Sequence, residues 1–165
     1  MADQLNEQKN ITAYDVADFF LAKANSVGEP ITNLKLQKLT YYAQAWFLAN
    51  KHKPLFEEDF EAWVHGPVQP DLYQKYKERG STPIITNLEL KEVAGRFDEK
   101  TFGFLNEVAE VYMPYGAFQL ELMTHKEKPW IDARGNFEPD EKCNKIISKS
   151  SIENFYAEKI QNKTN

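Results

Sequence analysis

Apolar residues recur along most of this chain at the three- and four-residue spacing that places them on one face of a helix. Between residues 33 and 50 they occupy nearly every side of the predicted helix, which is typical of a helix at the centre of its domain. Prolines and glycines interrupt the pattern where one helix ends and the next begins. The pattern predicts helices at residues 12–25, 33–50, 70–79, 99–112, 117–125, 129–134 and 151–160.

Polar residues suited to capping precede three of these helices. Thr12 with Asp15, and Ser150 with Glu153, have the spacing of a capping box, and Asp98 is a favourable N-cap. Helical spacing also indicates which apolar side chains face inward. The core is expected to include Leu39, Ala43, Trp46, Phe47, Phe102, Leu105 and Phe155.

One stretch departs from the helical pattern. Residues 60–64 alternate apolar and polar side chains, which favours a short strand. Gly66 and Pro67 are expected to turn the chain after it, because a proline keeps the residue before it out of the helical region. Two adjacent isoleucines, Ile84 and Ile85, lie in an ambiguous stretch and could form a second short strand.

The elements together predict a mainly α protein. We expect a single compact helical domain over residues 12–160, with room for one small β-hairpin. Residues 1–11 and 161–165 are polar and without periodicity, so they are expected to be flexible ends.

Composition and charge narrow the function classes. With 165 residues, 42% hydrophobic and 27% charged, the chain has the size and composition of one globular domain. Its net charge of −5 is the opposite of what phosphate-neutralising proteins show, so specific nucleic-acid binding is not expected. Lys142, Lys145 and Lys149 form one small basic cluster and Lys35 with Lys38 another, and solvated helix faces explain both.

The lone cysteine and the absence of long apolar runs bear on location. Cys143, expected in a short charged helix at residues 140–145, cannot form an internal disulfide and fits a reducing compartment. The first residues have no apolar core of a signal peptide, and no run approaches the length of a membrane span. A cytoplasmic protein without membrane contact is expected.

No spacing typical of catalysis or metal binding is present. His52, His65 and His125 are isolated in sequence, and Cys143 has no partner for a metal knuckle or a nucleophilic dyad. Glu121 and His125 are one helical turn apart, but one such pair is more often a surface hydrogen bond than half a metal site. We therefore expect no catalytic residue, no metal and no cofactor.

Three polar residues on the central helix admit two interpretations. Gln37, Tyr41 and Gln44 share a face of an otherwise apolar helix. They are either buried polar groups with hydrogen-bond partners inside the protein or the exposed strip of a binding groove. The sequence leaves both alternatives open.

Two clusters of residues, in this order, carry a family resemblance. The first consists of Leu36-Gln37-Lys38-Leu39, Tyr41-Tyr42-Ala43-Gln44, Pro54-Leu55-Phe56, Glu61-Ala62-Trp63, Gly66-Pro67-Val68, Pro70 and Leu72-Tyr73. The second consists of Leu120, Thr124-His125, Glu127, Pro129-Trp130 and Ala133-Arg134. With these clusters the chain resembles the Panacea domain, the SocA-like antitoxins that occur in bacteria and their phages.

The resemblance implies an antitoxin of a toxin–antitoxin system that neutralises a cognate toxin by direct binding. The toxin would be encoded by the adjacent gene, and its identity does not follow from the pattern. One alternative is an adaptor that delivers the toxin to a protease, and another is a phage-associated enzyme or regulator of unknown chemistry. The residues expected near the partner are Gln37, Tyr41, Gln44, Trp63, His65, Gly66, Pro67 and Tyr73.

Overall fold

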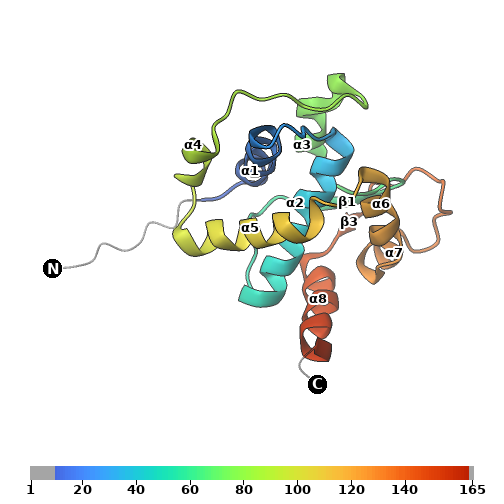
Figure 1. Cartoon of the computed structure of the whole chain (residues 1–165). Helices are drawn as coiled ribbons and strands as arrows, with labels where there is room; N and C mark the ends of the chain where they lie inside the picture. The colour runs from blue at the N-terminus through green and yellow to red at the C-terminus, as the bar shows by residue number, and fades with distance from the viewer. Residues whose placement is uncertain (1–9, 164–165) are drawn as a thin grey trace.

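The computed structural model describes residues 10–163 and shows one helical domain with a small sheet (Figure 1). Residues 1–9 and 164–165, parts of the predicted flexible ends, lie outside this range. In chain order the elements are α1 (Ala13–Ser26), α2 (Asn33–Lys51), β1 (Phe60–Trp63), β2 (Gly66–Val68), α3 (Pro70–Tyr76), the 3-10 turn η1 (Lys77–Arg79), α4 (Leu90–Ala94), α5 (Glu99–Tyr112), α6 (Ala117–His125), α7 (Lys128–Arg134), β3 (Ile146–Ile147) and α8 (Lys149–Lys163).

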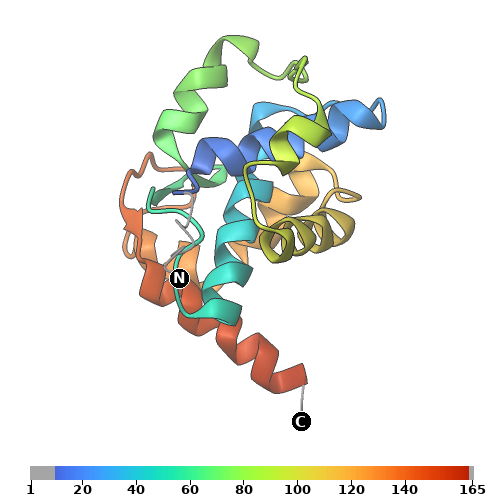
Figure 2. The same cartoon turned by 90° about the vertical axis from the view of Figure 1, so that its left-hand side faces the viewer.

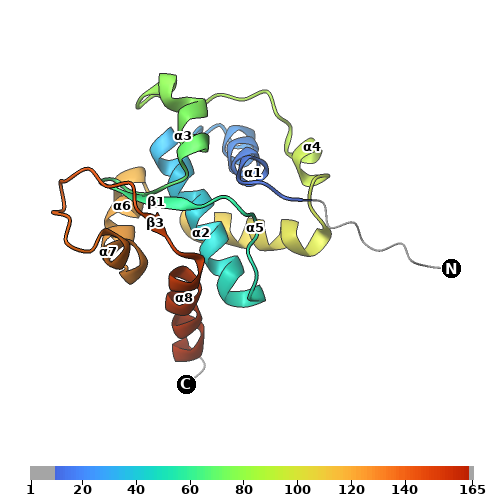
Figure 3. The ribbon, with the colours of Figure 1, turned by 180° about the vertical axis from the view of Figure 1, so that it is seen from behind.

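Helix α2 is the central element, as its pattern predicts. It begins after Thr32, whose hydroxyl accepts the Lys35 N–H at 3.2 Å, and ends at His52 in the left-handed conformation. It packs against α1, α3, α5, α6, α8 and β2. Figure 3 shows α1 and α4 on one side of α2, with the sheet, α6 and α7 on the other. Figure 2 shows α8 along the lower half of α2.

Helix α1 begins with the predicted capping box. The Thr12 hydroxyl accepts the Asp15 N–H at 3.3 Å, and the Asp15 carboxylate accepts the Thr12 N–H at 3.0 Å. The helix lies between α2, α4 and α5, and most of its side chains are buried. Burial on nearly all sides explains why its apolar positions exceed one face.

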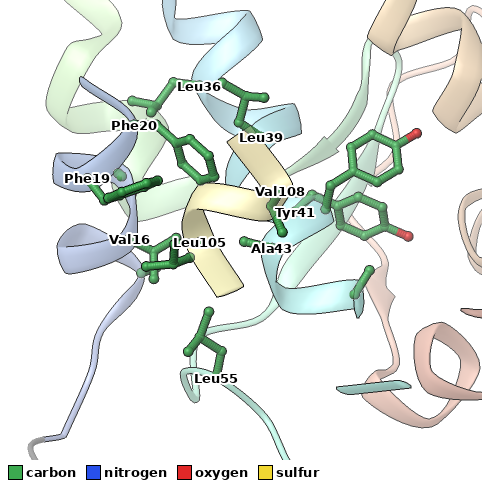
Figure 4. Close-up of a cluster of buried hydrophobic side chains, with 14 of the residues drawn as sticks. Val16, Phe19, Phe20, Leu36, Leu39, Tyr41, Ala43, Leu55, Leu105 and Val108 are labelled. Atoms are coloured by element: carbon green, nitrogen blue, oxygen red, sulfur yellow. The ribbon is translucent and has the colours of Figure 1, made fainter. Parts of the chain in front are cut away.

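The hydrophobic core fills the space between α1, α2 and α5 (Figure 4). Leu39, Ala43, Phe47 and Leu105 are buried as predicted. The prediction of full burial is wrong for three large aromatic residues, which pack against the core while remaining partly exposed at its edge. These residues are Trp46, Phe102 and Phe155.

The sheet contains a tighter hairpin than predicted. Trp63 pairs with Gly66, so the turn lies at Val64 and His65, and the prediction that Gly66 and Pro67 form the turn is wrong. These two residues belong to β2, an edge strand, where a proline costs no ladder hydrogen bond. The ladder, rather than proline chemistry alone, sets the turn position.

The third strand was not predicted, and the second strand considered at Ile84 and Ile85 does not form. Ile84 is buried and donates its N–H to the Ile31 carbonyl at 2.7 Å, while Ile85 is exposed. Strand β3 pairs with the outer side of β1, giving the order β2-β1-β3. The helix predicted at residues 140–145 is wrong, because Cys143 is buried in an irregular segment that leads into β3.

Helix ends differ from the predictions in two further places. Helix α8 begins at Lys149, where the Ser148 hydroxyl accepts the Ser151 N–H at 3.1 Å, so Ser148 rather than Ser150 is the cap. The helix continues to Lys163, past its predicted end. Helix α4 was missed, because a five-residue helix is too short to show a period.

The packing of α2 leads to a stability prediction. Leu39 lies fully buried in the core, so Leu39→Ala leaves a cavity and is expected to lower the free energy of unfolding by about 2–5 kcal/mol. Val111 is an exposed apolar residue on α5, and Val111→Ala is the control, with an expected change within about 0.5 kcal/mol. Urea unfolding measures both, and equal midpoints for the two variants would contradict the central position of α2.

Candidate functional site

The polar residues of α2 are buried. Gln44 donates from Nε2 to the Phe56 carbonyl at 2.7 Å and accepts the Leu55 N–H on Oε1 at 2.8 Å. Both ends of the amide are therefore satisfied by the backbone that leads from α2 to the sheet. Gln44 fixes this connection to α2.

Gln37 forms a corresponding link to the start of α3. Its Nε2 donates to Oδ1 of Asn33 at 3.0 Å, and its Oε1 accepts the Gln69 N–H at 3.0 Å. Gln69 in turn caps α3 by accepting the Leu72 N–H at 2.8 Å. For Gln37 and Gln44 the structure therefore agrees with the interpretation as satisfied buried groups, not with an exposed strip.

Tyr41 is buried as well. Its ring packs edge-to-face against Tyr42 and Phe60, with centroids 5.7 Å and 5.3 Å away. Within the described range of 10–163, its hydroxyl has no hydrogen-bond partner. Burial, followed by the charge of Glu127, raises the pKa of Tyr41 well above its ordinary value. Tyr41 therefore contributes to the interior of the domain.

A fully buried lysine joins α2 to the hairpin. Lys38 has an exposed fraction of 0% and donates from Nζ to the Pro67 carbonyl at 3.1 Å. The interpretation of Lys38 as part of a solvated basic face is wrong, because the α2 face that carries it is covered by β2 and α6. Burial lowers the pKa of Lys38 to about 7, with the charge of Glu121 acting in the opposite direction.

Gly66 allows the hairpin to approach this lysine. It has a φ of +101°, and a Cβ placed on it would lie 2.6 Å from Cε of Lys38 and 2.7 Å from Oγ1 of Thr124. Real Cβ atoms essentially never come this close to another heavy atom, so a side chain at residue 66 would have to displace Lys38 and Thr124. The buried lysine, Gly66 and Thr124 thus form one packed junction.

Glu121 lies at the outer edge of this junction. Its Oε1 is 2.7 Å from Nδ1 of His65 in the hairpin turn and 3.9 Å from Nε2 of His125. The His65 side chain is 71% exposed, whereas Glu121 is nearly buried. The predicted Glu121–His125 surface pair is therefore part of an interface between α6 and the hairpin. Among residues 10–163, no three His, Cys, Asp or Glu residues are placed to hold a metal ion.

Two residues of the second motif cluster bind the backbone of strand β1. Nε1 of Trp130 donates to the Trp63 carbonyl at 2.8 Å, and Nη1 of Arg134 donates to the Ala62 carbonyl at 2.8 Å. His125 stacks on Trp130 with centroids 4.2 Å apart. Burial lowers the pKa of His125, so the neutral ring is favoured. Arg134 also donates from Nη2 to the Glu138 and Glu141 carbonyls, so its guanidinium binds backbone carbonyls.

A half-buried carboxylate joins α7 to α2 and α8. Oε1 of Glu127 accepts the hydroxyls of Tyr42 at 3.1 Å and Tyr156 at 2.7 Å. Burial raises the pKa of Glu127, while these hydroxyl donors lower it. The sequence pattern predicted neither the hydrogen bonds of Glu127 nor the burial of Lys38. An ionisable residue inside an apolar stretch is the signal that could have singled out Lys38.

The eight residues expected near a partner divide by exposure. Gln37, Tyr41, Gln44, Gly66 and Pro67 are buried. Trp63, His65 and Tyr73 reach the surface around the hairpin. The rings of Trp63 and Tyr73 pack together, with centroids 5.0 Å apart.

The junction leads to a test at Gly66. Gly66→Ala is expected to destabilise the protein by at least about 2 kcal/mol more than Gly80→Ala, because Gly66 has both a positive φ and no room for a Cβ. Gly80 is the matched control, since it has a φ of +54° but open space around it. Chemical denaturation of both variants measures the difference, and similar losses would contradict the close contact with Lys38.

Burial of Lys38 leads to a pH-dependence. Below pH 7 the amine of Lys38 is protonated in both the folded and the unfolded state. Between pH 7 and the ordinary lysine pKa of 10.5, only the unfolded chain keeps the proton, so the free energy of unfolding rises with pH. Relative to Lys38→Met, the wild type should gain about 2–3 kcal/mol between about pH 7.5 and about pH 9.5. Denaturant unfolding across this range measures the gain, and a constant difference would contradict the lowered pKa.

Comparison with known proteins identifies the family. Residues 36–131 match the family described as "Antitoxin SocA-like, Panacea domain". The chain is 39% identical over 87 residues to a protein named Antitoxin SocA from Caulobacter vibrioides (strain NA1000 / CB15N), a match that covers 53% of this chain and 46% of that protein. The chain thus spans about half the length of this relative.

No solved structure matches the chain. Over residues 10–163, no helix has the length and apolar character needed to cross a membrane. The family match covers more than half of the chain, including the central helix, the hairpin and α6. The chain therefore belongs to the SocA-like antitoxin family with a Panacea domain.

Proposed function

We propose that this protein is the antitoxin of a toxin–antitoxin system and that it neutralises its toxin by binding it directly. Membership of the SocA-like family is the observation that carries this proposal, supported by the similarity to a protein named Antitoxin SocA. The proposed partner is a toxin encoded by the neighbouring gene, met in the cytoplasm. Neutralisation by binding needs no catalytic group and no cofactor.

The geometry around the hairpin supports binding by a rigid surface. Trp63, His65 and Tyr73 reach the surface. Each of them forms a hydrogen bond with another element of the domain. The Trp63 carbonyl accepts a hydrogen bond from Trp130, Glu121 holds His65, and the Tyr73 carbonyl accepts from Nδ2 of Asn33 at 3.1 Å. Residues fixed before binding lose little conformational entropy on complex formation, which favours affinity.

The charge of the chain suits one class of toxin. A net charge of −5 attracts a basic surface, and toxins that act on RNA or nucleotides bind their substrates through such surfaces. Complementary charge accelerates association more than it raises affinity. An inhibitor that must capture a toxin as soon as it is made benefits from a high association rate.

Co-expression with the neighbouring gene tests the proposal. The wild-type chain should restore growth in cells that express the neighbouring gene product, and it should co-purify with that product. Tyr73→Ala is expected to weaken the complex by about 2 kcal/mol, the cost of removing an aromatic anchor. Ile85→Ala, at an exposed residue far from the hairpin in sequence, is the control and should bind as the wild type does. Circular dichroism confirms that both variants are folded.

The same experiment in a protease-deficient host separates direct binding from delivery to a protease. Rescue that persists in this host supports inhibition by binding, because no degradation is then required. Rescue that is lost there, with toxin binding retained, would replace the proposal by the adaptor function. A neighbouring gene product that is not toxic, or that does not bind, would contradict the proposal as a whole.

A further inference from the structure

Strand β1 carries Glu61 on the partly open face of the small sheet. Side chains alternate along a strand, so Glu61 and Trp63 lie on one face and Phe60 and Ala62 on the other. Phe60 and Ala62 are buried, whereas Glu61 and Trp63 are half-buried. The face that carries Glu61 is therefore the one that another molecule can reach.

The strand register places apolar residues beside Glu61. Glu61 lies opposite Val68 of β2 and opposite Ile146 of β3. Residues directly opposite in an antiparallel pair share a face, with Cβ atoms about 4.5–5.5 Å apart. Val68 is buried, but Ile146 is 57% exposed. The accessible part of this surface, called here the Glu61 face, consists of Glu61, Trp63 and Ile146.

The Glu61 carboxylate is held in position without a cation. Its Oε1 accepts the indole N–H of Trp63 at 2.8 Å. The Trp63 ring in turn packs on the ring of Tyr73. Over residues 10–163, no lysine, arginine or histidine forms an ion pair with Glu61. The negative charge of Glu61 is therefore available for another molecule.

Cations on the segments next to the sheet contact other groups. Lys149 binds Asp59 at 2.7 Å. Lys145 lies over the Phe137 ring, 5.5 Å from its centre. Arg134 donates to three backbone carbonyls.

The cations around the hairpin, α3 and the approach to β3 do not neutralise Glu61 either. His65 contacts Glu121 at 2.7 Å. Lys75 lies 5.3 Å from the centre of the Tyr14 ring. Lys142, four residues before β3, is exposed and has no ion pair within the described range.

A guanidinium group fits this arrangement better than an ammonium group. It is planar, pairs with a carboxylate through two N–H donors and stacks on aromatic rings, among which tryptophan is the most favourable. A lysine ammonium is a strongly hydrated point charge without this paired geometry. A carboxylate beside a half-buried indole therefore favours arginine, whose apolar stem can pack against an exposed isoleucine.

We propose that the Glu61 face binds an arginine side chain of the toxin. The guanidinium pairs with the carboxylate of Glu61 and contacts the Trp63 ring, and the stem of the arginine packs against Ile146. This inference rests on the proposed function. It adds the residue type that the toxin presents and the carboxylate that receives it.

A charge-neutral variant tests the carboxylate. Glu61→Gln keeps an oxygen that can accept the Trp63 N–H, so circular dichroism should show a folded protein. It should weaken binding of the purified neighbouring gene product by about 10-fold or more, because the arginine loses its counter-ion. Glu57→Gln is the matched control, since it changes the net charge equally at an exposed residue of the same segment. It should bind within about 2-fold of the wild type in isothermal titration calorimetry.

An arginine scan of the neighbouring gene product tests the identity of the bound side chain. One arginine-to-alanine variant should bind the wild-type chain about as weakly as Glu61→Gln binds the unmodified product. Combining the two changes should add little further loss, because both remove the same contact. Coupling of Glu61 to a lysine, or to no arginine, would overturn the proposal.

A conservative variant tests the apolar part of the Glu61 face. Ile146→Thr keeps a β-branched residue in β3 but replaces exposed apolar surface by a hydroxyl group. It should weaken binding by about 3-fold or more. Ile85→Thr makes the same change at a residue that is 59% exposed in another segment, and it should bind as the wild type does.

The outcomes separate this site from the proposed function. Binding by the wild type with full affinity in Glu61→Gln would overturn the arginine site and leave the proposed function intact. Equal losses in Glu61→Gln and Glu57→Gln would show an effect of net charge alone and would also reject the site. A wild-type dimer that Glu61→Gln dissociates would assign the Glu61 face to a second copy of the chain instead. No binding by the wild type would overturn both proposals.

Discussion

The contact between the buried amine of Lys38 and the Gly66–Pro67 backbone determines how the rest of the domain assembles. The amine needs a hydrogen-bond acceptor because it is cut off from water, and the Pro67 carbonyl provides one at 3.1 Å. That acceptor can come close only because residue 66 has no side chain. Strand β2 is thereby held against α2, and the turn at Val64 and His65 follows from the pairing of β1 with β2. Helix α6 closes the junction through Thr124.

A buried amine is an expensive way to hold two elements together, since a hydrophobic contact of equal volume is often as stable. The advantage of the amine is that its hydrogen bond has a defined direction. An apolar side chain would tolerate a shift of the hairpin along α2, whereas an amine pairs with one carbonyl and loses that pairing when the strand slips. Trp130 and Arg134 act in the same way, because each donates a hydrogen bond to one backbone carbonyl of β1. The hairpin is thus fixed in register by three side-chain donors rather than by a long ladder.

Local chemistry explains which parts of this structure could be predicted from the sequence. The boundaries of α5 and α6, and the cap at Thr12, depend on nearby residues and were predicted correctly. Strand β3 depends on pairing with a segment far away in the chain. The two residues Ile146–Ile147 are too few to show a pattern that predicts this pairing. The site shows the same division. The spacing of Gln37, Tyr41 and Gln44 placed them on one face of α2, but which elements cover that face is a tertiary fact.

The burial of those residues changes what the family motif means physically. Gln37, Lys38, Gln44, Gly66 and Trp130 are among the residues that carry the resemblance to the family, and these five are interior in this structure. They describe how the scaffold is built, and an interior residue cannot distinguish one partner from another. Phe118 is outside the motif and exposed, as is Leu122. The motif therefore describes the junction that builds the domain, and exposed residues outside it, such as Phe118 and Leu122, can vary without disturbing that junction.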